Sequence, residues 1–139
     1  MPWPDPDPAG SDAAPLPGAN TDLGRLVAAA ADLCRKPLRH GVLLPEAWDG
    51  RDLDLRLRIE ARDPEGRRLP EHDLELELYP SGPDLHLTLA WAADDGRPML
   101  WQGGHPVWMD GGNGQRCAAP ADGAPLEALA RRLRALLVG

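Results

Sequence analysis

Long apolar runs are missing from this sequence. The longest candidates, residues 42–44 and 136–138, fall far short of the roughly 20 residues that a membrane-spanning helix needs. The first residues alternate proline with tryptophan and aspartate, and they lack the basic start and continuous apolar stretch of a signal peptide. We therefore expect a soluble protein in the cytoplasm that does not associate with a membrane.

Cysteine is scarce, with two residues in the chain of 139. A secreted domain of this size that depended on disulfides would carry more cysteines at regular spacings. Cys34 falls on the apolar side of a predicted helix and Cys117 falls in an irregular segment. We expect both to be small core residues without a structural disulfide, and a regulatory thiol pair is the alternative.

The residues of familiar catalytic motifs are also few. Serine occurs only as Ser11 and Ser81, and neither stands on the strand-to-helix elbow of a serine hydrolase. The only lysine, Lys36, precedes a proline and follows no glycine-rich loop, which argues against a phosphate-binding P-loop. The glycines at 111–114 lack the spacing of a dinucleotide fingerprint. We therefore name no catalytic residue and expect no cofactor, and a non-enzyme is favoured over an enzyme of unfamiliar type.

Histidines are few and dispersed. They occur as His40, His72, His86 and His105. None lies within one helical turn of another or beside a cysteine at ligand spacing, so we expect no metal site. His72 stands between two acids and fits a solvated loop, whereas His86 fits the outer face of a strand.

Positive charge is in the minority. The chain has 15 basic and 22 acidic residues, which gives a net charge of −7. The field of such a protein repels phosphate backbones rather than collecting them. Nucleic acid is therefore disfavoured as a partner.

Proline recurs at positions 2, 4, 6, 8, 15 and 17. Because proline fixes φ and lacks an N–H, this composition does not predict a packed helix or strand. We expect residues 1–19 to form a disordered proline-rich tail and residues 20–139 to form a single α+β domain. The tail either solubilises the domain or carries a recognition motif for an aromatic-lined groove.

Two amphipathic helices are predicted, one at each end of the domain. The first begins after capping residues near Asn20 and is closed by Arg35, Lys36 and Pro37. Its apolar positions follow helical spacing at 23, 26, 27, 30, 33 and 34. The second runs from near Pro125 to the end of the chain, with an apolar stripe of the same spacing. We expect both stripes to pack on one face of a sheet.

Alternation with period two dominates the middle of the chain. It predicts strands at 53–61, 74–78 and 85–91, a strand at 99–102 after a turn, and a possible edge strand at 42–44. The fold class is therefore α+β, with an antiparallel meander of about four to five strands flanked by the two helices. In a hairpin of the first two long strands, the pattern places Arg56 and Arg58 opposite Glu77 and Glu75, as a solvated face of the sheet.

The segment 99–116 differs from the rest in composition. It combines two tryptophans, a histidine, two methionines and glycine pairs in a chain that has no phenylalanine. Large amphipathic rings beside permissive backbone favour a contact surface. Its candidate binding residues are Trp101, His105, Trp108, Met109 and Asp110, with Trp108 the better contact candidate of the two tryptophans. The other interpretation is that both tryptophans complete the core and the glycines form a bulge and a turn, and the shortage of other aromatic residues favours it.

Three function classes follow. The first is a non-catalytic accessory or regulatory protein that binds another protein, or a second copy of itself, through the exposed sheet face or the 99–116 segment. The second is a small-ligand-binding domain, or an enzyme of unfamiliar type, that uses His105 and Asp110 in a tryptophan-lined pocket. The third is single-stranded nucleic-acid binding, with rings stacking on bases and with Arg131, Arg132 and Arg134 contacting phosphates.

Overall fold

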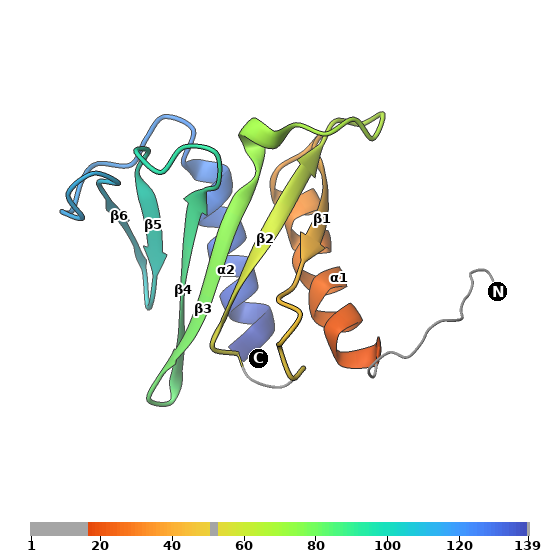
Figure 1. Ribbon diagram of the computed structural model, residues 1–139. Coiled ribbons are helices and arrows are strands. Elements are labelled where there is room, and N and C mark those ends of the chain that lie inside the picture. Colours follow the sequence, from red (N-terminus) through yellow and green to blue (C-terminus); the bar gives the residue numbers. More distant parts are fainter. Residues whose placement is uncertain (1–16, 51–52, 139) are drawn as a thin grey trace.

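The computed structural model describes residues 17–50 and 53–138 and shows one six-stranded sheet with two helices (Figure 1). In chain order the elements are α1 (Pro17–Cys34), β1 (Arg39–Leu43), β2 (Leu55–Arg62), the short 3-10 helix η1 (Pro70–His72), β3 (Leu74–Ser81), β4 (Asp84–Trp91), β5 (Met99–Gln102), β6 (Pro106–Met109) and α2 (Ala124–Val138). All neighbouring strands pair antiparallel, and their order in the sheet is their order in the chain. The predicted α+β meander is confirmed, with six strands instead of four to five.

The first helix begins earlier than the sequence pattern indicates. α1 starts at Pro17, whereas the capping residues place the start near Asn20. Proline is tolerated in the first turn of a helix, where its missing N–H has no partner within the helix to lose. Residues 1–16 lie outside the described residues, so the disordered tail remains a prediction.

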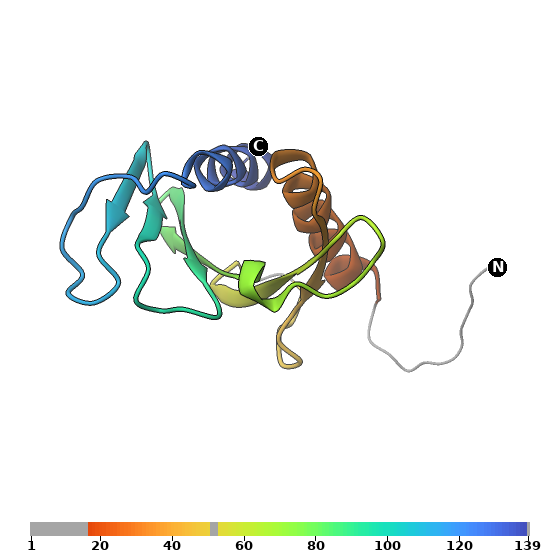
Figure 2. The same cartoon turned by 90° about the horizontal axis from the view of Figure 1, so that it is seen from above.

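Both helices pack on the same face of the sheet. Figure 2 shows α1 and α2 together on the concave side, with the strands curving around them. The inward residues of the strands and the apolar stripes of the helices form one core. Its largest fully buried apolar side chains are Val27, Ile59, Leu74, Leu76, Leu78, Leu87, Leu89, Leu100, Leu126, Leu129 and Leu133. Within the described part of the chain, neither helix has the combination of length and apolarity that a membrane crossing requires.

β2 and β3 form the hairpin that the alternating pattern predicts. Arg56 lies opposite Glu77 and Arg58 lies opposite Glu75 in the register. The Arg56 Nη2 atom is 3.5 Å from Glu77 Oε1, whereas Arg58 turns its Nε atom toward Asp73 Oδ2 at 3.4 Å. The predicted register is confirmed, but only the first of the two expected charge pairs forms.

β6 is the strand that the period-two pattern does not predict, and it lies in the 99–116 segment between two pairs of glycines. It pairs with β5 and places Trp108 opposite Leu100 on the inner face. It starts with Pro106, which a strand at the edge of a sheet tolerates. The free edge of β6 is partly covered, because the N–H of Cys117 donates to the carbonyl oxygen of Trp108 at 2.9 Å.

Candidate functional site

The sheet face turned away from the helices is divided by composition. On β2 and β3 its outward residues are mostly charged, whereas on β4, β5 and β6 they are mostly apolar. Within the second group, Asp84 and His86 at the start of β4 are polar. We call the remaining residues the outer apolar patch, and they are Thr88, Ala90, Met99, Trp101, Val107 and Met109. Each of these residues is half-buried and alternates with buried residues of the core. Neither α1 nor α2 lies on this face (Figure 2).

Trp101 is the largest side chain of the outer apolar patch, and its neighbours hold it in one orientation. Its Nε1–H donates to the hydroxyl oxygen of Tyr79 at 2.6 Å. The ring of His86 meets it edge to face, with 5.1 Å between the ring centroids. The indole also packs against Gly103, two residues further along the chain, where an added Cβ would come within 2.6 Å of the ring. Trp101 is therefore a fixed ring on a half-exposed surface.

Trp108 lies on the opposite face of the sheet. It is 5% exposed and belongs to the core. Its Nε1–H donates to Glu127 Oε2 of α2 at 2.6 Å, and an added Cβ at Gly123 would come within 2.7 Å of its ring. The expectation that Trp108 is the better contact residue is therefore wrong. Alternation along β6 places it inward, which the sequence does not reveal because the register with β5 decides it.

The other three candidate binding residues separate along β6. His105 is exposed in the turn before this strand. Met109 is on the outer face opposite Met99 and belongs to the outer apolar patch. Asp110 follows the strand, and its Oδ1 accepts the backbone N–H of Gly112 at 2.7 Å, so it stabilises a turn. Because the whole strand separates His105 from Asp110, the structure does not bring these two residues into one pocket.

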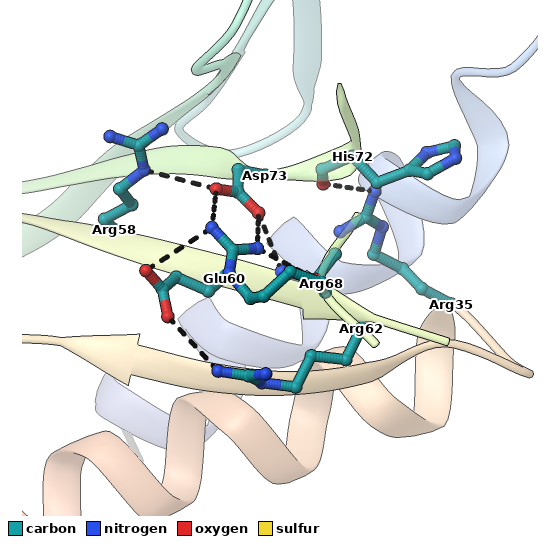
Figure 3. Close-up of polar contacts among 8 residues, drawn as sticks. Arg35, Arg58, Glu60, Arg62, Arg68, His72 and Asp73 are labelled. Carbon is teal, nitrogen blue, oxygen red and sulfur yellow. Dashed lines mark hydrogen bonds and ion pairs between the residues drawn. The ribbon is translucent and has the colours of Figure 1, made fainter. Parts of the chain in front are cut away.

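A buried carboxylate that the sequence pattern misses lies at the charged end of the sheet (Figure 3). Asp73 is 0% exposed, and Arg68 donates to both of its oxygens at 2.9 and 2.8 Å. The N–H of Ala61 donates to Oδ1 at 2.8 Å, and Arg58 approaches Oδ2. Burial acts to raise the pKa of Asp73, but these hydrogen bonds and positive charges outweigh it and hold the pKa below its usual range.

The arrangement around Asp73 is that of a structural anchor. Both carboxylate oxygens are occupied by donors from this chain, and Arg68 also donates to the carbonyl oxygen of Ala61 at 2.9 Å. The anchor fastens the loop between β2 and β3 onto β2. The sequence pattern assigns Asp73 to a solvated loop beside His72, and no spacing rule indicates that a carboxylate next to Leu74 is buried.

A second set of polar contacts, made by Asp32, Arg35 and His40, joins α1 to β1. His40 Nδ1 lies 2.9 Å from Asp32 Oδ1, and His40 Nε2 lies 3.1 Å from Arg35 Nη1. A guanidinium only donates, so Nε2 accepts and Nδ1 carries the proton that is given to Asp32. Burial is the main cause that lowers the pKa of His40, which agrees with a neutral ring. Because both ring nitrogens are engaged, this aspartate–histidine pair has no free nitrogen to serve as a catalytic base.

Metal ligands and reactive thiols complete the description of the site chemistry. Within residues 17–50 and 53–138, no group of three histidine, cysteine, aspartate or glutamate side chains could hold a metal ion. Cys34 and Cys117 are free thiols that are partly buried against the core. Burial raises the pKa of Cys34 against the opposing charges of Arg132 and Arg131, so the unreactive thiol form prevails at neutral pH.

Comparison with known proteins assigns the chain to a family. Residues 24–136 match the model of the family described as Domain of unknown function (DUF8659), and the chain belongs to this family. No curated protein and no solved structure matches the chain. The matched range contains all six strands, so it includes both the outer apolar patch and the Asp73 anchor.

Proposed function

We propose that this member of the DUF8659 family is a non-catalytic accessory or regulatory protein that binds another protein through the outer apolar patch. One observation carries the proposal: the uncovered face of β4, β5 and β6 presents apolar and aromatic side chains where a solvated sheet face would present polar ones. Contiguous apolar surface on an otherwise charged protein is typical of an interaction site.

The outer apolar patch has the makeup of a binding hot spot. Tryptophan contributes more binding energy than most residues when a partner buries it. Because Tyr79, His86 and Gly103 already fix the ring of Trp101, binding would cost little further side-chain entropy. Met99 lies beside this ring on β5, and its flexible side chain adapts to the shape of a partner.

Acidic residues border the outer apolar patch and indicate the chemistry of the partner. Glu75 pairs in register with Ala90, and Glu77 pairs with Thr88, so both carboxylates stand at the boundary between β3 and β4. The protein as a whole carries a net charge of −7. We therefore assign the partner as a different protein whose apolar contact surface is flanked by lysine or arginine. A second copy carries the same net charge of −7, which opposes self-association.

Single-stranded nucleic acid fits this geometry poorly. Trp101 is on the outer face of the sheet, whereas Arg131 and Arg132 are exposed on α2, which packs on the inner face. Arg134 is engaged with its own chain, because its Nε–H donates to the carbonyl oxygen of Leu85 at 3.1 Å. The ring and the helix arginines therefore do not face one strand of nucleic acid together.

The test uses the purified full chain as bait in an extract of the native cells, with three variants beside the wild type. Trp101→Ala removes the ring, and Thr88→Arg places a charge in the centre of the outer apolar patch. Arg56→Ala is the matched control, since it changes the charged half of the same face. Proteins retained by the wild type are identified, produced in pure form and titrated against all four baits.

We expect a pure partner whose affinity falls at least tenfold with Trp101→Ala and Thr88→Arg and stays within about twofold with Arg56→Ala, since exposed charges contribute little. Size in solution is measured for each bait alone. A partner that binds all four baits equally would overturn the proposal. The proposal would also be overturned if the wild type associates with itself and Thr88→Arg makes it a monomer. In that case the outer apolar patch binds a second copy of the protein.

A further inference from the structure

A pocket of about 310 Å³ lies at the end of the molecule where α1 finishes and α2 begins. In Figure 1 this is the upper end, where the last residue of β4 and the short helix η1 also lie. The pocket is separate from the outer apolar patch, because its walls come from the helices and from the inward-facing Trp91. Its volume is at the lower end of the range for small-ligand sites.

Arg35 is a buried cation in the wall of this pocket. It is 6% exposed. Its Nη2–H donates to the carbonyl oxygen of His72 at 2.9 Å, and Nη1 lies 3.1 Å from Nε2 of His40. These two contacts engage neutral groups and leave further N–H donors of the guanidinium available. Burial lowers the pKa of Arg35 to about 10, partly offset by Asp73, so the side chain is still charged at neutral pH.

Arg35 lacks the carboxylate partner that buried arginines normally have. The nearest buried acid, Asp73, is occupied by Arg68 and Arg58, and Figure 3 shows Arg35 joined to the carbonyl of His72 instead. No aspartate or glutamate in the described part of the chain forms an ion pair with Arg35. A buried charge without a counter-ion is costly, so such an arrangement marks a candidate binding site.

Trp91 supplies a second donor without a partner. It is 7% exposed, and its buried Nε1 has no hydrogen-bond acceptor among the described residues. The guanidinium of Arg97 lies over its ring, 3.9 Å from the centroid. Asp122, the acid in the pocket wall, is bound by Arg97 and therefore does not serve Arg35. The pocket wall thus combines a buried guanidinium that has no carboxylate partner with a tryptophan whose buried N–H has no acceptor among the described residues.

The surroundings of the pocket also favour an anion. Lys36 adds a positive charge at its wall. Pro125 and Leu126 belong to the first turn of α2 and line the pocket as well, so the positive end of the helix dipole lies at this side. The pocket is therefore locally positive, although the protein as a whole is acidic.

We propose that this pocket binds a small carboxylate that has a flat apolar body, with the carboxylate taken by Arg35 and the body held between Trp91 and the apolar wall. Pro37, Leu38 and Leu126 supply that wall, which suits an aromatic or branched aliphatic group better than a sugar or a nucleotide. The carboxylate supplies the counter-ion that Arg35 lacks, in a pocket that Trp91 also lines. Guanidinium groups bind carboxylates through paired hydrogen bonds.

The experiment titrates the full chain with benzoate and, separately, with benzamide, its uncharged counterpart of the same shape. Binding is followed by the NMR signals of the indole N–H groups, with that of Trp91 assigned by substitution. We expect benzoate to move the Trp91 signal and to bind at least tenfold more tightly than benzamide. Inorganic phosphate, titrated in the same way, tests whether any anion suffices.

Two variants assign the effect to Arg35. Arg35→Met removes the charge and keeps an unbranched apolar chain, and it should abolish the preference for benzoate while the protein stays folded. Arg39→Met is the matched control, because Arg39 is exposed on β1 and lies outside the pocket. The control should bind benzoate as the wild type does. Thr88→Arg should bind it equally well, which separates this site from the outer apolar patch.

Several outcomes would overturn the assignment. They are equal binding of benzoate and benzamide, an unmoved Trp91 signal up to about 10 mM benzoate, and a preference that survives Arg35→Met. Phosphate binding as tight as benzoate would show a general anion site and would equally contradict the proposed ligand class. If Arg35→Met fails to fold, the comparison of benzoate with benzamide on the wild type still decides.

Discussion

The two halves of the outer sheet face have the same backbone pattern but different chemistry. On β2 and β3 the outward residues find partners within the chain, as Arg56 does in Glu77 and Arg58 does in Asp73. On β5, β6 and the end of β4 the outward residues are mostly apolar, and neither helix covers them. A polar face is complete in water, whereas an apolar face gains free energy by leaving it. The difference indicates where binding is expected.

The largest effect should come from removing the anchor below the charged half. Asp73→Ala removes a fully buried carboxylate that accepts hydrogen bonds from the N–H of Ala61 and from both Nη atoms of Arg68. A hydrogen bond to a charged group contributes about 1.5–3 kcal/mol, so the loss of several should exceed about 3 kcal/mol. Urea unfolding of the variant measures the loss. The control is Glu77→Ala on β3, the strand that follows Asp73, and the exposed pair of Glu77 with Arg56 should contribute under about 1 kcal/mol. Similar losses from the two variants would mean that Asp73 is no anchor.

The next effect distinguishes the two tryptophans on opposite faces of the sheet. Trp108→Ala should cost about 3 kcal/mol of folding free energy, because the ring is buried against α2. Trp101→Ala should cost only about 1 kcal/mol, mainly through the hydrogen bond to Tyr79. Chemical denaturation of both variants checks the order. A larger loss at Trp101 would show that the outer apolar patch serves folding more than binding.

As the pH falls, the contacts of His40 with Asp32 and Arg35 should weaken before the Asp73 anchor does. Burial lowers the pKa of His40 in the folded state, so the unfolded chain takes up the proton first as the pH falls below the usual value of 6.5. Stability from this residue is present above pH 6.5 and is lost as the pH falls through the folded pKa. His40→Gln should remove this loss. Thermal unfolding between pH 7 and pH 5 measures it, and an unchanged slope in the variant would contradict the assignment.

The smallest effect is expected from the surface charges. Arg56→Ala should change the free energy of unfolding by roughly 0.2–1 kcal/mol, since its pair with Glu77 is solvated. The change should also shrink in high salt, because the interaction is screened. Unfolding measured at low and high salt tests both points. A loss well above 1 kcal/mol would show that the charged half is more than a solvated face.

Most of the fold could be predicted from the sequence, because its long elements have clear periods. Leucine alternation in β2, β3 and β4 gives strands whose inward residues are the core, and the same pattern gives the register of Arg56 with Glu77. β6 could not be predicted. It is short and begins with proline, so it has no period of its own, and the register with β5 decides which way Trp108 points.

The candidate sites could be predicted from the sequence less fully than the fold. The segment 99–116 does contain Trp101, Met99 and Met109 of the outer apolar patch, because its composition is unusual. Arg35 has the appearance of a basic residue that closes a helix, and nothing in its neighbours indicates a buried position. Asp73 has the appearance of a loop acid. Both are placed by tertiary contacts that join segments of the chain with no shared pattern.

The order of the strands has a consequence for the chain during synthesis. Each strand pairs with the one made just before it, so the sheet can grow step by step as residues emerge, without pairing strands that are distant in the chain. α2 comes last, and it brings Leu126, Leu129 and Leu133 to the middle of the core. Until these 15 residues are available, the part of the concave side that α2 covers is open to water and to other chains, although α1 is already made.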